Sequence, residues 1–260
     1  MSNSNTGLVR IYNAFVNSMR DFKLAFSILL LVLLASLCIF YFSQSTKKDE
    51  LVVVVHGLAR SDNAMWLMEK RLAAEGYDIC LLDYKTIGQD NNTLFTDTEA
   101  QIDECLGEQK THFVGHSLGG LVIKNYLNNP VNKSKVNIMG EVVFAGTPNH
   151  GSELADALKD HYLMAIGGEV TRSLMTGIDT MGDKLGNNTV PVGVIAGRKG
   201  IAVTEKYFSD ENDGVVSVES TKLTNMKDFI VLDVSHSAMR YNKEVALQIL
   251  HYLENGAFRH

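Results

Sequence analysis

The chain has 260 residues, of which 45% are hydrophobic and 21% are charged, and this composition is ordinary for a globular protein. The formal net charge is -6 and no long run of lysine or arginine occurs, which argues against nucleic acid as a partner. Three cysteines, Cys38, Cys80 and Cys105, are too few for a disulfide framework or a zinc site. We expect Cys80 and Cys105 to be buried free thiols; they could pair if that part of the chain lies outside the cytoplasm.

The N-terminal part contains a long apolar run, LAFSILLLVLLASLCIFYF, at residues 24–42. At about 1.5 Å per residue, this run reaches roughly the 30 Å of a bilayer core. It predicts a transmembrane anchor at 24–42, preceded by a cytoplasmic segment at 1–23 and followed by a linker at 43–50. The alternatives are a buried core helix, which would show a polar face, and a cleaved signal peptide, which needs a small-residue cleavage site.

The charges beside the apolar run predict its orientation. Arg10, Arg20 and Lys23 precede the run, and Lys47 and Lys48 follow it, so the positive excess on the N-terminal side is slight. We therefore expect the N-terminus in the cytoplasm and the larger part of the chain outside it, in the periplasm if the organism is a bacterium.

From residue 51 onward, short apolar runs alternate with helical patterns. Strands are expected at 51–55, 78–84, 112–115, 136–146, 191–197 and 228–234. Helices are expected at 63–77, 96–106, 118–129 and within 236–256. This alternation predicts one α/β domain with a mostly parallel sheet and helices on both faces. Functional residues in such a domain lie at the carboxyl ends of the strands.

One short segment, GHSLG at residues 115–119, matches the G-x-S-x-G pattern of a nucleophile elbow. The segment follows a predicted strand and begins a predicted helix, which is the context that the elbow requires. Gly115, Gly119 and Gly120 leave room for the tight turn, and the helix N-terminus would stabilise negative charge beside Ser117. The pattern predicts that Ser117 is a nucleophile; the alternative is a glycine-rich turn with a surface serine.

A serine nucleophile needs a general base, and eight histidines compete for this role. His236 directly follows the last predicted strand, so we expect it at a carboxyl strand end beside Ser117. His150 also follows a predicted strand and is the alternative base. His112 and His116 are four residues apart, but they belong to a strand and a turn, so they do not predict a metal site.

The acid that orients the base is expected in the polar segment between the last two predicted strands. Asp213 is the favoured candidate, because Asn-Asp-Gly forms a tight turn that the following apolar residues would anchor. Asp210 and Glu211 are alternatives in the same segment. The order Ser117, Asp213, His236 along the chain is that of the α/β-hydrolase triad.

A serine that attacks a carbonyl carbon also needs two hydrogen-bond donors for the oxyanion that forms. The backbone N–H of Leu118, directly after the nucleophile, is the first candidate. The N–H of Leu58, in the loop HGLARS after the first predicted strand, is the second.

Five segments, HGLARS, GHSLGG, GTPNHGSELAD, NDGVVSVEST and SHSAM, together resemble the α/β-hydrolase superfamily, in particular the lipase and esterase branch that includes small bacterial triacylglycerol lipases. The resemblance extends over residues 51–256, which we expect to form the catalytic domain. It implies hydrolysis of carboxylic or lipid esters through a Ser-Asp-His triad and an acyl-enzyme, without metal or organic cofactor. The triad would be Ser117, Asp213 and His236.

Other activities remain open on this fold. An acyltransferase, a thioesterase or an amidase could use the same triad, and a non-catalytic binding protein is a remote alternative. Only about 45 residues separate the fourth predicted strand from the fifth, so we expect a minimal lid or none. The apolar residues within 161–177 either border an acyl site or belong to the core.

Overall fold

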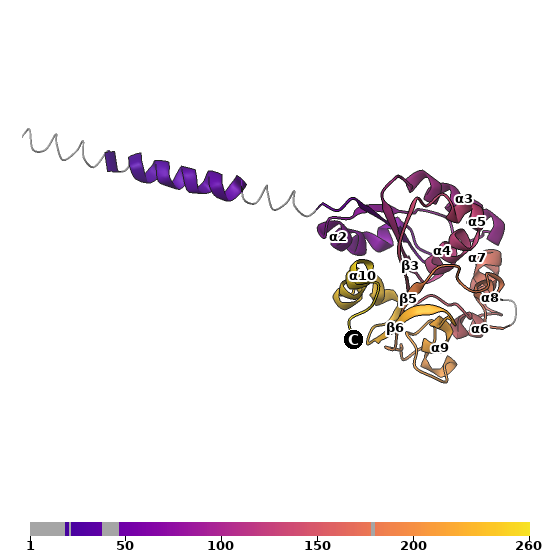
Figure 1. The fold of residues 1–260 in the computed structure, drawn as a ribbon. Helices are drawn as coiled ribbons and strands as arrows, with labels where there is room; N and C mark the ends of the chain where they lie inside the picture. Colours follow the sequence, from indigo (N-terminus) through magenta and orange to yellow (C-terminus); the bar gives the residue numbers. More distant parts are fainter. Residues whose placement is uncertain (1–18, 21, 38–46, 178–179) are drawn as a thin grey trace, which may run out of the picture. The chain divides into compact units, whose positions relative to one another are not determined.

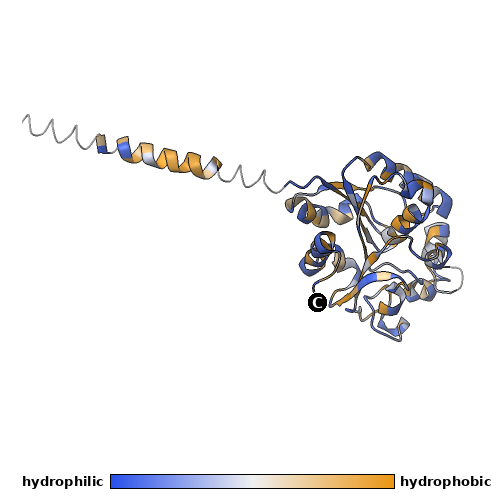
Figure 2. Ribbon diagram, viewed as in Figure 1, coloured by the Kyte–Doolittle hydropathy of each residue, from blue (hydrophilic) through white to orange (hydrophobic). Residues whose placement is uncertain are grey.

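The computed structural model describes residues 19–20, 22–37, 47–177 and 180–260, and Figure 1 shows its fold. The chain divides into two compact units, residues 1–47 and 48–260. In the first unit, residues 22–37 are helical, and Figure 2 shows that most of this helix is hydrophobic.

The predicted transmembrane anchor is not supported by the part of the chain that the structure describes. No helix among these residues is both long enough and apolar enough to cross a membrane. Residues 38–42, which complete the predicted anchor, lie outside the described residues.

The second unit contains a six-stranded sheet in the order β2-β1-β3-β4-β5-β6. Its strands are β1 (Glu50–Val55), β2 (Asp78–Leu81), β3 (Lys110–His116), β4 (Ile138–Ala145), β5 (Val192–Gly197) and β6 (Met226–Leu232). All neighbouring strands pair in parallel. Parallel strands are buried on both faces, which explains the unbroken apolar runs of β1 and β5.

Helices connect the strands. The longer ones are α2 (Trp66–Ala74), α3 (Asn91–Cys105), α4 (Leu118–Asn128), α7 (Tyr162–Arg172) and α10 (Lys243–Asn255). The shorter turns are η1 (Asp62–Met65), α5 (Pro130–Lys133), α6 (Glu153–Ala157), α8 (Met181–Lys184), η2 (Glu205–Tyr207), α9 (Val218–Thr221) and η3 (His236–Arg240).

Each face of the sheet has its own apolar core. One core contains Ile102 of α3 and Leu121 of α4, both fully buried. The other contains Met68 of α2 and Ile249 of α10, with 1% and 0% of their surface exposed. Figure 1 shows these two pairs of helices on opposite sides of the sheet. Each such side chain contributes about 1.5–3 kcal/mol by burial, and the predicted α/β architecture is confirmed.

The start of α3 differs from the prediction. The helix begins at Asn91, and the Asp90 carboxylate caps it by accepting a hydrogen bond from the Thr93 N–H at 2.9 Å. The predicted helix began at Thr96, which instead lies inside α3. Aspartate caps a helix as well as threonine does, and the polar Asn91 and Asn92 concealed this earlier start.

The two cysteines near the start of the domain also correct the prediction. Cys80 on β2 and Cys105 at the end of α3 form a disulfide, with their Cα atoms 6.1 Å apart. Their side chains are partly buried against the core below α3 and α4. The expectation of free thiols was wrong because the crossover helix α3 returns its last residue to the edge strand of the sheet.

Candidate active site

Ser117 occupies a tight turn between β3 and α4, with a φ of 57° and a ψ of −127°. Its N–H donates a hydrogen bond to the Ala145 carbonyl at the end of β4, at 2.9 Å. Gly119 must lack a side chain, since a Cβ there would overlap the Val55 carbonyl oxygen of β1. Strained backbone of this kind costs about 1–3 kcal/mol and clusters at functional sites.

The structure brings the three predicted catalytic side chains together. His236 Nε2 lies 2.9 Å from Ser117 Oγ, and His236 Nδ1 lies 2.7 Å from Asp213 Oδ2. Because a carboxylate only accepts hydrogen bonds, we assign the ring proton to Nδ1, which leaves Nε2 to accept from the serine hydroxyl. All three residues are buried, with Ser117 the most exposed at 8%.

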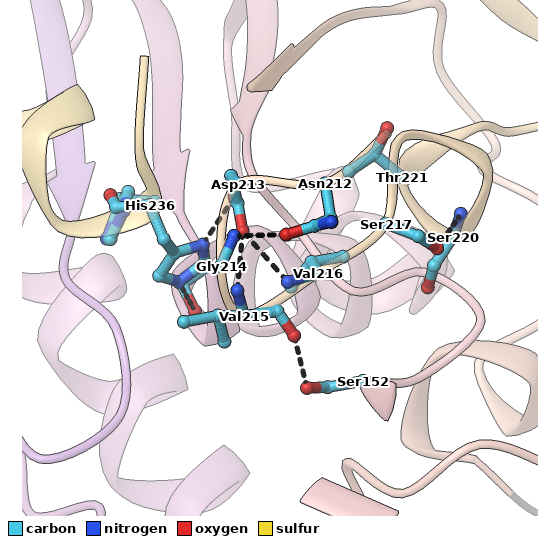
Figure 3. A network of polar contacts seen from close by, with 12 residues as sticks. Ser152, Asn212, Asp213, Gly214, Val215, Val216, Ser217, Ser220, Thr221 and His236 are labelled. Carbon is cyan, nitrogen blue, oxygen red and sulfur yellow. Dashed lines mark hydrogen bonds and ion pairs between the residues drawn. The ribbon is translucent and has the colours of Figure 1, made fainter. Parts of the chain in front are cut away.

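The loop after β5 fixes Asp213 from several sides, as Figure 3 shows. Its Oδ1 accepts hydrogen bonds from the N–H groups of Val215 and Val216, at 3.0 and 2.8 Å. Its carbonyl accepts from the N–H of His236 at 2.9 Å. The Ser152 hydroxyl donates to the Val215 carbonyl and so attaches this turn to the segment before α6. The tight turn expected at Asn-Asp-Gly therefore aims one carboxylate oxygen at the imidazole.

The residues that the sequence offered as alternative base and alternative acid do not contact Ser117 or His236. His150 is half-exposed and contacts Asp183, with 2.7 Å between its Nδ1 and the carboxylate. Asp210 lines a surface groove with His150, away from the triad. His112 is buried and contacts the Glu50 carboxylate at 3.0 Å. Among the described residues, no group of histidine, cysteine and acidic side chains is arranged to hold a metal ion.

His116 is a residue of the site whose role the sequence analysis missed. Its Nε2–H donates to the carbonyl of His236 at 3.0 Å, and the two rings lie 4.9 Å apart. Burial, followed by the nearby charge of His236, lowers the pKa of His116 well below its ordinary value, so this ring is neutral. His116 is thus a positioning residue for the base. The only sequence signal was its place directly before the serine.

A cavity of about 210 Å³ opens beside Ser117 and His236. Most of its lining is apolar: Leu58, Pro148, Leu154, Ala155, Leu158, Met164, Leu174, Val215 and Val216. Arg60, Ser152, Thr171 and Ser237 complete it. Of the apolar residues within 161–177, Met164 and Leu174 border the candidate site. The five-residue helix α6 and the longer helix α7 both contribute side chains to the lining of this cavity.

The two residues whose N–H groups are predicted to bind the oxyanion both lie near the nucleophile. Leu118 is fully buried at the start of α4, directly after Ser117. Leu58 lines the cavity from the turn after β1. Gly57 permits the close approach of that turn, because a Cβ there would lie 2.8 Å from the Cβ of Ser117.

The region around the nucleophile matches a known family in sequence. Residues 45–147 match the family described as "Putative serine esterase (DUF676)". This segment is less than half of the chain; it includes the turn after β1 and the elbow, and it ends before Asp213 and His236. No curated protein matches the chain in sequence.

Several solved structures share the fold. The mature lipase BlEst2 of Bacillus licheniformis is 24% identical with a TM-score of 0.61, over 78% of this chain and 90% of the lipase. A lipase-esterase related protein of Clostridium acetobutylicum is 17% identical with a TM-score of 0.56, over 80% of this chain and 96% of that protein. The metagenomic carboxyl esterase MGS0156 is 18% identical with a TM-score of 0.56, over 73% of this chain and 65% of the esterase.

These similarities confirm the predicted α/β-hydrolase fold and the resemblance to lipases and esterases. The family match confirms the expectation that the chain is a carboxylic-ester hydrolase.

Proposed function

We propose that the chain is a serine esterase that hydrolyses esters of short or medium acyl chains through an acyl-enzyme on Ser117. The supporting observation is the bridging position of His236, which lies 2.9 Å from Ser117 Oγ and 2.7 Å from Asp213 Oδ2. Nucleophile, base and orienting acid of a catalytic triad occupy this arrangement.

In the proposed reaction, His236 Nε2 takes the hydroxyl proton while Ser117 Oγ attacks the ester carbonyl carbon. Asp213 holds the ring orientation and stabilises the imidazolium. The N–H groups of Leu118 and Leu58 donate to the oxyanion that develops on the carbonyl oxygen. His236 then gives its proton to the leaving alcohol, and a water molecule activated by the same ring releases the acid from Ser117.

The size of the cavity beside Ser117 limits the acyl chain. A cavity of about 150 Å³ holds benzene, so about 210 Å³ has room for roughly eight carbon atoms. The apolar lining favours an uncharged chain, because transfer of a charge into such surroundings is costly. We therefore expect the rate to peak near six to eight carbons, about the capacity of this cavity.

The test is hydrolysis of 4-nitrophenyl esters from acetyl to palmitoyl, with variants of each triad residue. We expect Ser117→Ala and His236→Ala to lower kcat by a factor of about 10⁴–10⁶, and Asp213→Asn by about 10⁴. His150→Asn, which alters the alternative base, should retain the parent activity. A folded parent without turnover, or an active Ser117→Ala variant, would contradict the proposal.

We propose further that residues 24–42 anchor the chain in a membrane, with the esterase domain on the extracytoplasmic side. Two features support this arrangement. The helix at 22–37 exposes large apolar side chains, such as Leu31 with 66% of its surface accessible. The Cys80–Cys105 disulfide fits an oxidising compartment.

Fractionation of cells that express the full chain tests the anchor and its orientation. We expect the chain in the membrane fraction after alkaline washing, and protease added to spheroplasts should digest the domain. Deletion of residues 1–43 should release the protein from that fraction. Recovery of the full chain with the soluble proteins would refute the anchor, and protection of the domain from protease would refute the orientation.

A further inference from the structure

The turn after β1 separates two hollows on the surface of the domain. Arg60 lines the apolar cavity that contains Ser117 and His236. It also lines an adjoining groove of about 580 Å³, whose lining is Ala59, Arg60, Asp83, Tyr84, Lys85, Thr86 and Ile87. A ligand bound at Ser117 that extends from the cavity past Arg60 would therefore enter this groove.

The groove presents cations that are available to a ligand. Arg60 and Lys85 are exposed, and neither forms an ion pair among the residues that the structure describes. Arg60 donates one hydrogen bond to the Ala59 carbonyl at 2.8 Å, which leaves further guanidinium N–H groups for a ligand. Asp83 is the one carboxylate in the lining, so the formal charge of the groove remains positive.

The backbone that carries Arg60 is held in place. Ala59 has a φ of 54°, an uncommon conformation for a residue other than glycine. Its N–H donates to the hydroxyl of the buried Thr86 at 2.8 Å. The Tyr84 hydroxyl donates to the His56 carbonyl at 2.5 Å, and the rings of these two residues stack at 4.2 Å. These contacts fix the backbone of the turn against the segment after β2, so Arg60 begins from a fixed backbone at the edge of the cavity that contains Ser117.

The two hollows differ in the groups that they accept. Most of the cavity lining is apolar, so a charged chain that enters the cavity beyond Arg60 would lose its hydration there without compensation. The adjoining groove is open and cationic, and a guanidinium binds carboxylate and phosphate oxygens through paired hydrogen bonds. An ester with one apolar side and one anionic side matches both hollows at once.

We propose that Arg60, assisted by Lys85, forms a subsite for an anionic group on the alcohol part of the substrate. The preferred substrates then combine a short or medium apolar acyl chain with an alcohol that bears a carboxylate or a phosphate. This inference rests on the proposed esterase function and names its substrate class.

Matched pairs of esters test the subsite in the full chain. The first pair is 4-nitrophenyl hexanoate and 3-carboxy-4-nitrophenyl hexanoate; the second is 1-hexanoylglycerol and its 3-phosphate. For each ester, kcat/KM is divided by the rate constant of alkaline hydrolysis, which removes the intrinsic difference in reactivity. The corrected kcat/KM of the anionic ester, divided by that of the neutral ester, then measures the contribution of the subsite. The pair with the larger ratio shows whether carboxylate or phosphate is preferred.

We expect a ratio of about ten in the parent for at least one pair, the size of a charge-assisted hydrogen bond. Arg60→Gln should bring this ratio close to one, and Arg60→Lys should give an intermediate value. An increase from about 0.05 M to about 0.5 M NaCl should lower the ratio in the parent, since salt screens exposed charges. Lys70→Gln, which removes an exposed charge from α2, should leave the ratio unchanged.

Three results would overturn the inference. A parent ratio near one in both pairs, or a ratio equal in the parent and Arg60→Gln, would leave the esterase function standing without the subsite. Faster hydrolysis of mono-4-nitrophenyl adipate, whose carboxylate is on the acyl chain, would place the anion on the wrong side of the ester. Absence of hydrolysis of every ester would instead reject the underlying function.

Discussion

Two turns with positive φ angles lie at the carboxyl ends of the neighbouring strands β1 and β3. Among the described residues other than glycine, only Ala59 and Ser117 have a positive φ, of 54° and 57°. The turn at Ser117 is supported within its own segment and by the adjacent β4, through glycines and the hydrogen bond to Ala145. The turn at Ala59 depends on Thr86, which is 27 residues away. Both turns thus have a partner that is distant in sequence, but only the turn at Ser117 also carries its own glycines, Gly115 and Gly119, and so only that turn leaves a local pattern in the sequence.

The largest loss of stability should follow from adding a side chain at Gly119, beside the turn at Ser117. In Gly119→Ala, the added Cβ would overlap the carbonyl oxygen of Val55, so β1 and α4 would have to separate. Overpacking typically costs about 1–3 kcal/mol, and we expect the upper end of this range because the obstacle is backbone. Gly107→Ala is the control, since Gly107, like Gly119, does not have a positive φ, and a Cβ there would meet only the flexible end of the Gln109 side chain. Urea unfolding measures both variants; equal losses would show that space at the elbow does not matter.

The disulfide supports the turn at Ala59 indirectly. Cys80 belongs to β2, the strand that precedes Tyr84 and Thr86, and Thr86 holds Ala59. It closes a loop with a sequence separation of 25, and loop entropy predicts a loss of about 3 kcal/mol on reduction. Unfolding with and without a reducing agent measures this loss. The variant Cys80→Ala/Cys105→Ala should unfold like the reduced parent; an equal stability of all three forms would exclude a role for the bridge.

The turn at Ala59 should lose its shape when the Thr86 hydroxyl, which accepts a hydrogen bond from the Ala59 N–H, is removed. In Thr86→Val, the N–H of Ala59 loses its partner, and because this bond is only partly buried the free energy of unfolding should fall by about 0.5–1.5 kcal/mol. The nearby N–H of Leu58 would also shift, and we expect kcat/KM to fall about tenfold. Thr96→Val, at an exposed position on α3, is the control. Unchanged kinetics in Thr86→Val would mean that the turn keeps its shape without the hydroxyl.

The same difference explains how much of the site could be predicted from the sequence. The nucleophile elbow could be predicted because Gly115, Ser117 and Gly119 lie within five residues, and the tight turn requires small residues at both glycine positions. The order of strands and helices was readable from periodicity, because each buried face repeats locally. In contrast, the contact of Ala59 with Thr86 left no pattern in the sequence, since it depends on the pairing of β1 with β2.

The elements between β4 and β5 illustrate a second limit. The helices α6 and α8 have five and four residues, too short for a helical repeat to be visible. The role of His116 was missed for a related reason: its partner is the carbonyl of His236, and a main-chain acceptor has no sequence signature. Side chains whose partners are remote backbone groups are thus the part of a site that a single sequence conceals.

Both turns follow a buried histidine, and this gives a pH dependence. Burial lowers the pKa of His56, and it lowers the pKa of His116 further. The folded protein therefore holds both rings neutral, while the unfolded chain binds protons below about pH 6.5. The free energy of unfolding should decrease as the pH falls from about 7 to about 5, by up to about 1.4 kcal/mol per pH unit for each histidine.

Urea titrations across this pH range, with His56→Asn and His116→Asn, separate the two contributions. Each variant should make the free energy of unfolding depend less steeply on pH. His116→Asn should do so down to lower pH, because the pKa of His116 is lowered further than that of His56. His251→Asn, at a partly exposed position near the end of α10, is the control. If neither His56→Asn nor His116→Asn changes the dependence of the free energy of unfolding on pH, other groups cause the acid sensitivity.

The smallest change in stability should come from relieving the backbone strain at Ala59. Glycine adopts a positive φ without the steric cost that alanine has there, about 1–2 kcal/mol, but it has more conformational entropy in the unfolded chain. Ala59→Gly should therefore raise the free energy of unfolding by about 0.5–1 kcal/mol. If the turn holds Arg60 in place, the same change should weaken discrimination between anionic and neutral esters, because the glycine backbone is less restricted. A gain in stability with unchanged discrimination would show that Thr86 alone is sufficient to hold the turn, and a loss of stability would mean that alanine is not strained at this position.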